Sequence, residues 1–443
     1  MNSAVIEKER SETPSSRSDK TWVRRAIWRW HFWAGLIAGP VLIVASITGA
    51  IYIFQPELTQ LLYPHLMQSV GEGEVSSLAS EVQAAQQEAG SEWTATVLEI
   101  NNLRGGSHAV FLTNESHDHR RIYIDPVGAA VLGERPKQDF LTIVLAIHRR
   151  LFVGTFGRVL VEFTTSWTIL LLVTGIYLWW PKSFRKLGGV FLPRLRGKRY
   201  VVARDLHSVP GMFLMPIGVV IAVTGLLYSL AWGSTFLLTG FASGSFDIEV
   251  NPPKSVVPAE AEVAATKLNV DDVMQLAMAN DMPLGRISIE IPTQEDGAFA
   301  FKSGDRYGPW VSAVLFVDQY SGEIIQMSRL SELPWMAQWT QWNYPLHVGS
   351  VLGWTTKFIW LVACVILVAL PLTGLWMWLV RRKKGTLSAP KKYDEPLPRW
   401  VWTVIILSGI FLPIAGISMV IVGLTERVRT RRAATRESSD ALS

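Results

Sequence analysis

The chain has 443 residues, of which 49% are hydrophobic, and its formal net charge is +5. Five segments reach the ~20 apolar residues that a helix needs to cross a bilayer. This excludes an ordinary soluble enzyme and predicts an integral membrane protein in contact with a lipid bilayer. The basic residues gather in short loops without interleaved stacking aromatics, so we expect no nucleic acid as a partner.

Long polar segments alternate with apolar helices along the chain. The first twenty residues are polar and mixed in charge, which predicts a disordered cytoplasmic tail and no cleavable signal peptide. The first half is predicted to contain a tail at 1–21, a first spanning helix at 22–54, a first outer domain at 55–140, and an interfacial segment with a second helix at 141–180. A basic loop at 181–206 then leads to a third helix at 207–232, a second outer domain at 233–340, and an interfacial segment with a fourth helix at 341–380. The chain is predicted to end with a basic loop at 381–399, a fifth helix at 400–424 and a tail at 425–443.

The charge distribution predicts which side each segment occupies. Eight lysines and arginines lie at 181–206 and seven at 381–399. The long segments are acidic, with twelve acidic against five basic residues at 55–147 and fourteen against six at 235–346. Because basic loops stay in the cytoplasm, we predict a multi-pass protein of the bacterial inner membrane with a cytoplasmic N-terminus and two periplasmic segments.

The fifth apolar segment leaves two topologies open. If it crosses the membrane, the arginine-rich tail after it lies outside, against the positive-inside rule. Pro413 and Gly416 in its middle permit a re-entrant or bent helix instead.

Each long outer segment contains the same order of predicted elements. A helical stretch comes first, at 77–90 in one segment and 259–280 in the other. Three runs of alternating apolar and β-branched residues follow, and a turn then leads into a last strand within 122–134 and 315–327. We therefore predict two α+β domains of related fold.

The apolar helices also repeat. Residues 31–52 match residues 207–228 without a gap, each with an initial histidine and a Thr-Gly pair near the end. His148 and His347 are both followed by glycine six residues on, a basic residue ten residues on and Thr-Gly 26 residues on. These matches predict an internal parallel repeat about an axis along the membrane normal. The expected fold is a membrane α-helical bundle of four repeat-related spanning helices plus a fifth, with two inserted α+β domains.

Four of the eight histidines begin the four repeat-related helices. The topology places His31 and His207 at the cytoplasmic side and His148 and His347 at the outer side. Two imidazoles that face each other across a helix bundle suit the axial positions of a b-type haem. We therefore predict two haems b, one for each same-depth pair.

The outer pair stands at a distance from the membrane core. His148 and His347 precede their continuous apolar runs by ten residues, which is ~15 Å along a helix. An interfacial segment is therefore expected to carry each of them. The single cysteine, Cys364, excludes the C-x-x-C-H attachment of a c-type haem as well as intrachain disulfides.

Anionic haem propionates require cations nearby. The candidates next to the four histidines in sequence are Arg29, Arg204, Arg149, Arg158 and Lys357. The simpler interpretation is that an interfacial histidine only caps a helix or reaches toward water. A loop between strands is the simpler interpretation of the histidines in 116–121, with a metal site as the alternative.

The outer segments, with IYIDPVG and LFVDQYSG, resemble PepSY domains, and the H-x3-G…TG helices resemble the PepSY-associated transmembrane helix family. The resemblance covers about residues 22–380. Some members of the family resemble inner-membrane reductases that carry haem and act on ferric siderophores in the periplasm. By this resemblance, His31, His148, His207 and His347 would be haem-iron ligands.

Two functions follow for testing. The first is a di-haem electron-transfer protein, an oxidoreductase that reduces a periplasmic Fe(III) chelate, with the aromatic stretch at 332–349 as a candidate acceptor site or a simple membrane-interface belt. The second is a non-enzymatic scaffold whose outer domains bind or regulate a peptide or protease. The cytoplasmic loops are too short for a nucleotide-binding βαβ unit. The electron donor is therefore expected to be a quinol or a separate cytoplasmic reductase.

Overall fold

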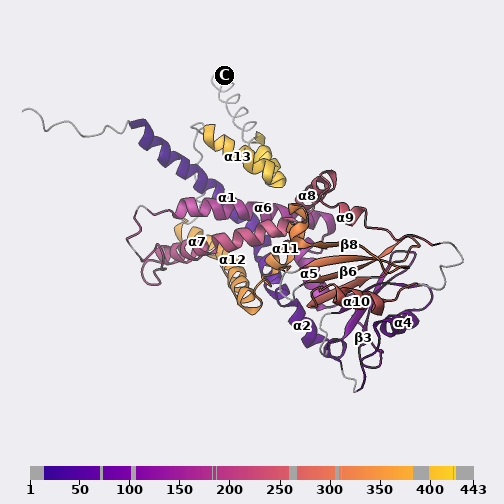
Figure 1. Ribbon diagram of the computed structural model, residues 1–443. Coiled ribbons are helices and arrows are strands. Elements are labelled where there is room, and N and C mark those ends of the chain that lie inside the picture. The colour runs from indigo at the N-terminus through magenta and orange to yellow at the C-terminus, as the bar shows by residue number, and fades with distance from the viewer. Residues whose placement is uncertain are drawn as a thin grey trace, which may run out of the picture. The chain divides into compact units, whose positions relative to one another are not determined.

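The computed structural model describes residues 14–69, 73–100, 106–181, 183–185, 187–258, 267–304, 309–310, 312–382, 399–422 and 424–425 (Figure 1). The first thirteen residues of the predicted N-terminal tail, nearly all of the basic loop at 381–399 and the C-terminal tail after 425 lie outside these residues. So do the first eight residues of the helix expected at 259–280. Helix α1 (Pro14–Tyr52) begins inside the predicted tail, so residues 14–21 are helical rather than disordered.

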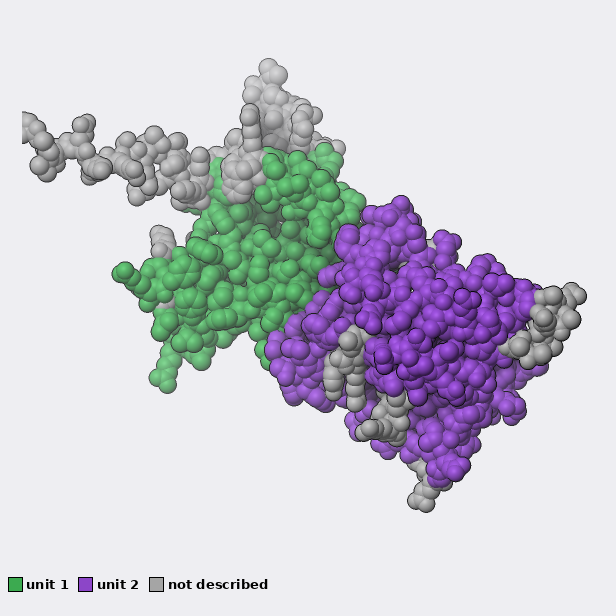
Figure 2. Space-filling view, in the orientation of Figure 1, with its two compact units in different colours: residues 1–47, 147–233, 362–443 green, residues 48–146, 234–361 purple. Residues whose placement is uncertain are grey.

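Among the described residues, four helices are long and apolar enough to cross a membrane, and they are the four repeat-related helices of the five segments expected from the sequence. Their spans are Trp22–Tyr52 within α1, α6 (Gly154–Trp179), α7 (Arg199–Leu226) and α12 (Trp354–Arg381). The chain divides into two compact units (Figure 2). Unit 1 holds residues 1–47, 147–233 and 362–443, and unit 2 holds residues 48–146 and 234–361.

Small residues bring the helices of unit 1 close together. A Cβ added to Gly39 of α1 would lie 3.1 Å from Pro371 of α12, and one added to Gly218 of α7 would lie 2.9 Å from Leu172 of α6. In a bilayer, helices associate through such close packing because the lipid tails remove the hydrophobic driving force.

The segment predicted as a fifth spanning helix is broken. Helix α13 (Arg399–Phe411) ends where a second short helix, Pro413–Val422, begins. A Cβ on Gly416 would lie 2.6 Å from the Cα of Gly409, whereas seven residues of a straight helix would separate these positions by ~10 Å. The chain therefore turns back on itself, which corrects the fifth spanning helix at 400–424 and supports the bent or re-entrant alternative that the sequence left open.

Unit 2 is built on one antiparallel sheet of eight strands in the order β4-β3-β2-β1-β5-β6-β7-β8. The strands are β1 (Thr94–Ile100), β2 (His108–Thr113), β3 (His119–Asp125), β4 (Ala130–Glu134), β5 (Arg286–Glu290), β6 (Ala298–Gly304), β7 (Ala313–Asp318) and β8 (Ile324–Arg329). All of them fall within or next to the runs expected from the sequence, because alternating apolar residues bury one face of each strand.

The two predicted outer domains share this sheet. Strand β1 pairs with β5 along Val97–Ile100, which joins the four strands of each segment into one layer. Helices α4 (Leu78–Ala89) and α10 (Val270–Ala279) pack on the same apolar core, and Asp271 accepts hydrogen bonds from the backbone of Leu78 and Ala79 at 2.7 and 2.9 Å. The two segments therefore form one domain in place of the two separate domains expected.

Further short helices lie between these elements in the described parts of the chain. They are α2 (Gln55–Leu62), α3 (Pro64–Met67), α5 (Phe140–Arg150), α8 (Ala231–Ala242), α9 (Asp247–Val250), the 3₁₀ helix η2 (Leu330–Glu332) and α11 (Trp335–Val348). Backbone with positive φ separates α5 from α6, at Leu151 and Phe152, and α11 from α12, at Gly349 and Gly353. His148 and His347 therefore lie in the last turns of two short helices that precede α6 and α12. This agrees with the expected separate segments, and neither histidine begins a spanning helix.

Candidate functional site

His31 and His207 lie side by side in unit 1. They come from α1 and α7, and their ring centroids are 6.2 Å apart with ring planes at 82°. Each imidazole keeps part of its surface accessible. The structure therefore brings together one of the two histidine pairs expected from the repeat.

The ring of His31 is oriented by the Thr-Gly pair of α6. Its Nδ1 lies 2.9 Å from Oγ1 of Thr174. That hydroxyl already donates its hydrogen to the carbonyl of Leu170 at 2.6 Å, so it accepts from Nδ1–H. A Cβ on Gly175 would touch the imidazole at 3.5 Å, so the glycine leaves room beside the ring. This network assigns the proton to Nδ1 and the lone pair to Nε2.

The ring of His207 is oriented in the same way by the Thr-Gly pair of α12. Its Nδ1 lies 2.9 Å from the carbonyl of Leu370 and 3.2 Å from Oγ1 of Thr373. A carbonyl only accepts, so Nδ1 carries the proton here too. A Cβ on Gly374 would lie 3.5 Å from the ring. Both imidazoles thus have Nε2 available as a metal ligand, which is the tautomer that second-sphere hydrogen bonds fix in metal-binding histidines.

The separation of the two rings fits a pair of imidazoles that would hold one haem iron between them. Metal–imidazole bonds of about 2.0–2.1 Å on opposite sides of one metal would place the ring centroids about 6.3 Å apart, since each centroid lies about 1.1 Å beyond its nitrogen. The observed 6.2 Å agrees with this separation. No cluster of three or more His, Cys, Asp or Glu side chains suited to a bare metal ion occurs among the described residues.

The imidazole of His148 is also held by a hydrogen bond from its Nδ1 to the backbone. Its Nδ1 donates to the carbonyl of Ala45, 2.9 Å away and three residues before Thr48. Burial is the main cause that lowers the pKa of His148, and the nearby charge of Arg149 adds to it against the hydrogen bond to Ala45. His148 belongs to unit 1 and His347 to unit 2, so their pairing stays a prediction.

Two of the five candidate cations already have carboxylate partners. Lys357 is buried and lies 2.5 Å from Glu57. Arg204 lies 2.6 Å from the fully buried Asp205, which also accepts from Arg194 at the same distance. These contacts indicate that Lys357 first serves to neutralise the partly exposed carboxylate of Glu57, and Arg204 the buried one of Asp205.

The sequence also proposed Arg29, Arg149 and Arg158 as partners of propionates. Arg29 precedes His31 by two residues and is partly buried. Arg149 is exposed in the last turn of α5, next to His148. Arg158 is partly buried in the second turn of α6.

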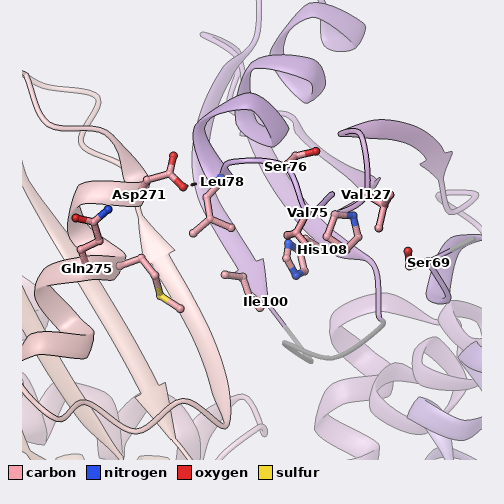
Figure 3. Close-up of a pocket in the computed structure, with 11 residues that line it drawn as sticks. Ser69, Val75, Ser76, Leu78, Ile100, His108, Val127, Asp271 and Gln275 are labelled. Atoms are coloured by element: carbon pink, nitrogen blue, oxygen red, sulfur yellow. Dashed lines mark hydrogen bonds between the residues drawn. The ribbon is translucent and has the colours of Figure 1, made fainter. Parts of the chain in front are cut away.

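A further histidine site in unit 2 was not predicted from the sequence. His108 of β2 lies 2.7 Å from Glu81 of α4, and the two side chains are 5% and 0% exposed. His108 also lines a cavity of about 290 Å³ together with Ser69 and Asp271 (Figure 3). None of the four candidate haem ligands lines this cavity. Glu81 and His108 are 27 positions apart in the chain, so no local motif marks the pair.

The histidines in 116–121 lie where an exposed loop was expected. His117 has positive φ, as turn residues often do, and is exposed. His119 lies at the start of β3, with its ring nitrogen 3.1 Å from the Thr113 hydroxyl. The aromatic stretch before His347 lies in α11, where the ring of Trp342 packs edge-on against Trp310 at 4.4 Å.

The comparison with known families finds a match. The model described as PepSY-associated TM region covers residues 28–381, which include all four histidines and the whole sheet. The search of curated proteins finds no match. The match extends over most of the chain, from residue 28 within α1 to the end of α12, so this chain belongs to the PepSY-associated TM region family.

Proposed function

We propose that this protein is a di-haem b-type electron-transfer protein of the bacterial inner membrane that reduces an Fe(III) chelate, such as a ferric siderophore, in the periplasm. The observation that supports it most is the inner histidine pair. His31 and His207 stand 6.2 Å apart on two different spanning helices, with both Nδ1 atoms engaged and both Nε2 atoms left to bind.

The chain supplies ligands and their orientation. Bound haem b would supply reversible one-electron chemistry, and two axial histidines would leave no open position for reaction with O2. Thr174 and the Leu370 carbonyl hold the imidazole planes, which limits the rearrangement that a change of charge at the metal would require. His148, with its Nδ1 on Ala45, is prepared in the same way at a second position.

The charge of the chain supports the proposed direction of the reaction. The basic loop at 181–206 and the exposed Arg24 and Arg25 would attract an acidic cytoplasmic reductase or lie next to a quinol at the membrane surface. The acidic segments at 55–147 and 235–346 would favour a neutral or cationic chelate as the acceptor, because an anion would be repelled within the ~8 Å Debye length at physiological salt.

The decisive experiment is a haem stoichiometry with a reduced-minus-oxidised spectrum on the full chain, purified in detergent from haem-replete cells. We expect two haems b per chain and loss of one in His31→Ala. The matched control is His117→Ala, which removes an exposed histidine and should keep both. A colourless protein would refute the proposal and favour the scaffold function of the sheet.

A second measurement tests the electron donor. NADPH alone should leave the haems oxidised, since the cytoplasmic loops have no room for a nucleotide domain. A quinol, or NADPH with a cytoplasmic flavin reductase, should reduce them. Reoxidation on addition of a ferric chelate would then support the acceptor, and fast reduction by NADPH alone would contradict the assignment of the donor.

A further inference from the structure

Asn343 is a fully buried polar side chain whose amide has no hydrogen-bond partner among the described residues. Its side chain is 0% exposed, and neither Oδ1 nor Nδ2 has a partner. A buried amide left unpaired costs free energy comparable to a lost hydrogen bond, so such groups in native proteins are nearly always satisfied by something.

Asn343 lies on the same face of α11 as His347. The two residues are four apart, which is one turn of helix or ~6 Å along its axis. Met336, seven residues before Asn343, is buried as well, so this is the inward face of α11. The amide therefore points to the side of the helix from which His347 would bind a haem.

The first repeat differs from the second at this position. The residue four before His148 is Val144, which is also buried and needs no hydrogen bond. The repeat therefore shows that the fold accepts an apolar side chain of similar size here. The polar amide in the second copy has a role that the packing of the helix alone does not require.

We propose that Nδ2 of Asn343 donates a hydrogen bond to a propionate of the haem that His347 ligates. This inference rests on the proposed function. Propionates are the only strong hydrogen-bond acceptors on the periphery of a haem b, whose remaining edge is apolar, so a buried donor next to the axial ligand has one class of partner. Oδ1 can accept from a water that accompanies the charged carboxylate.

The test uses the full haem-loaded chain and three variants. Asn343→Val copies the first repeat, Asn343→Asp replaces the donor by a negative charge, and Gln341→Ala changes an exposed residue of the same helix as the control. The measurements are the dissociation rate and the midpoint potential of each haem. The haem of His31 and His207 reports in the same sample whether the variant is folded.

Asn343→Val should release the His347 haem about tenfold faster, the factor that one hydrogen bond to a charged group provides. Its midpoint potential should fall, because an unpaired propionate favours the oxidised iron, and Asn343→Asp should lower it further. The other haem and the Gln341→Ala protein should not change. An unchanged His347 haem in Asn343→Val, or equal loss of both haems, would overturn this inference while leaving the proposed function intact. A protein that binds no haem would instead refute the proposed function.

Discussion

Thr174→Val and Thr373→Val form a matched pair of variants, because both threonines stand in equivalent Thr-Gly motifs and both hydroxyls donate within their own helix. The two variants differ in whether the imidazole Nδ1 keeps a hydrogen-bond acceptor. Thr174 is the partner of His31 Nδ1, at 2.9 Å. His207 Nδ1 lies closer to the Leu370 carbonyl, at 2.9 Å, than to Thr373, at 3.2 Å, and would keep that carbonyl.

The magnitude follows from this difference. Loss of an outer-sphere partner typically weakens metal binding by about 10–100-fold, so Thr174→Val should weaken the inner haem by at least about tenfold. Thr373→Val removes only the longer of two contacts and should stay within about threefold, the value of a fraction of a hydrogen bond worth about 1 kcal/mol. Valine has nearly the shape of threonine, so packing contributes little to the comparison.

The assay is transfer of haem from the purified protein to an excess of a haem-scavenging protein, followed by absorbance. The rates for the inner haem in the two variants are compared with that of the unmodified chain. If Thr373→Val released this haem as fast as Thr174→Val, or if neither variant differed from the unmodified chain, the assigned roles of the Nδ1 contacts would be wrong.

Three further predictions concern other contacts. His31→Ala and His207→Ala should each deplete the same haem, as resolved by electron paramagnetic resonance, and depletion of different haems would contradict the 6.2 Å pairing. Lys357→Met should lower stability by about 1–3 kcal/mol because it leaves the carboxylate of Glu57 without its cation, and adding Glu57→Gln should recover part of the loss in thermal unfolding. Although burial alone would raise the pKa of Asp318, hydrogen bonds from three backbone N–H groups lower it below its usual 3.8. Its contribution to the sheet should therefore be complete above pH 3.8 and lost as the pH falls through the folded pKa, and Asp318→Asn should remove this acid-dependent step from a fluorescence titration.

The sequence by itself determined the local elements of this protein. Apolar length identified the four candidate spanning helices, since a helix must be apolar along the whole bilayer, but it did not separate them from the broken fifth segment. Alternating residues identified the eight strands, since each strand buries every second side chain. The repeated histidine and Thr-Gly spacings marked the candidate ligands, because two copies of one unit keep the same positions.

The tertiary structure decided which elements meet. The pairing of β1 with β5 turned two expected domains into one sheet, and nothing within either strand specifies that neighbour. The contact of Thr174 with His31 joins residues 143 positions apart. The contact of Glu81 with His108 joins two residues that no sequence motif marks as partners. Periodicity records only whether a residue faces inward. Which residue an inward-facing side chain contacts depends on how all the elements pack. The 6.2 Å separation of His31 and His207 and the unpaired amide of Asn343 therefore appear only in the folded chain.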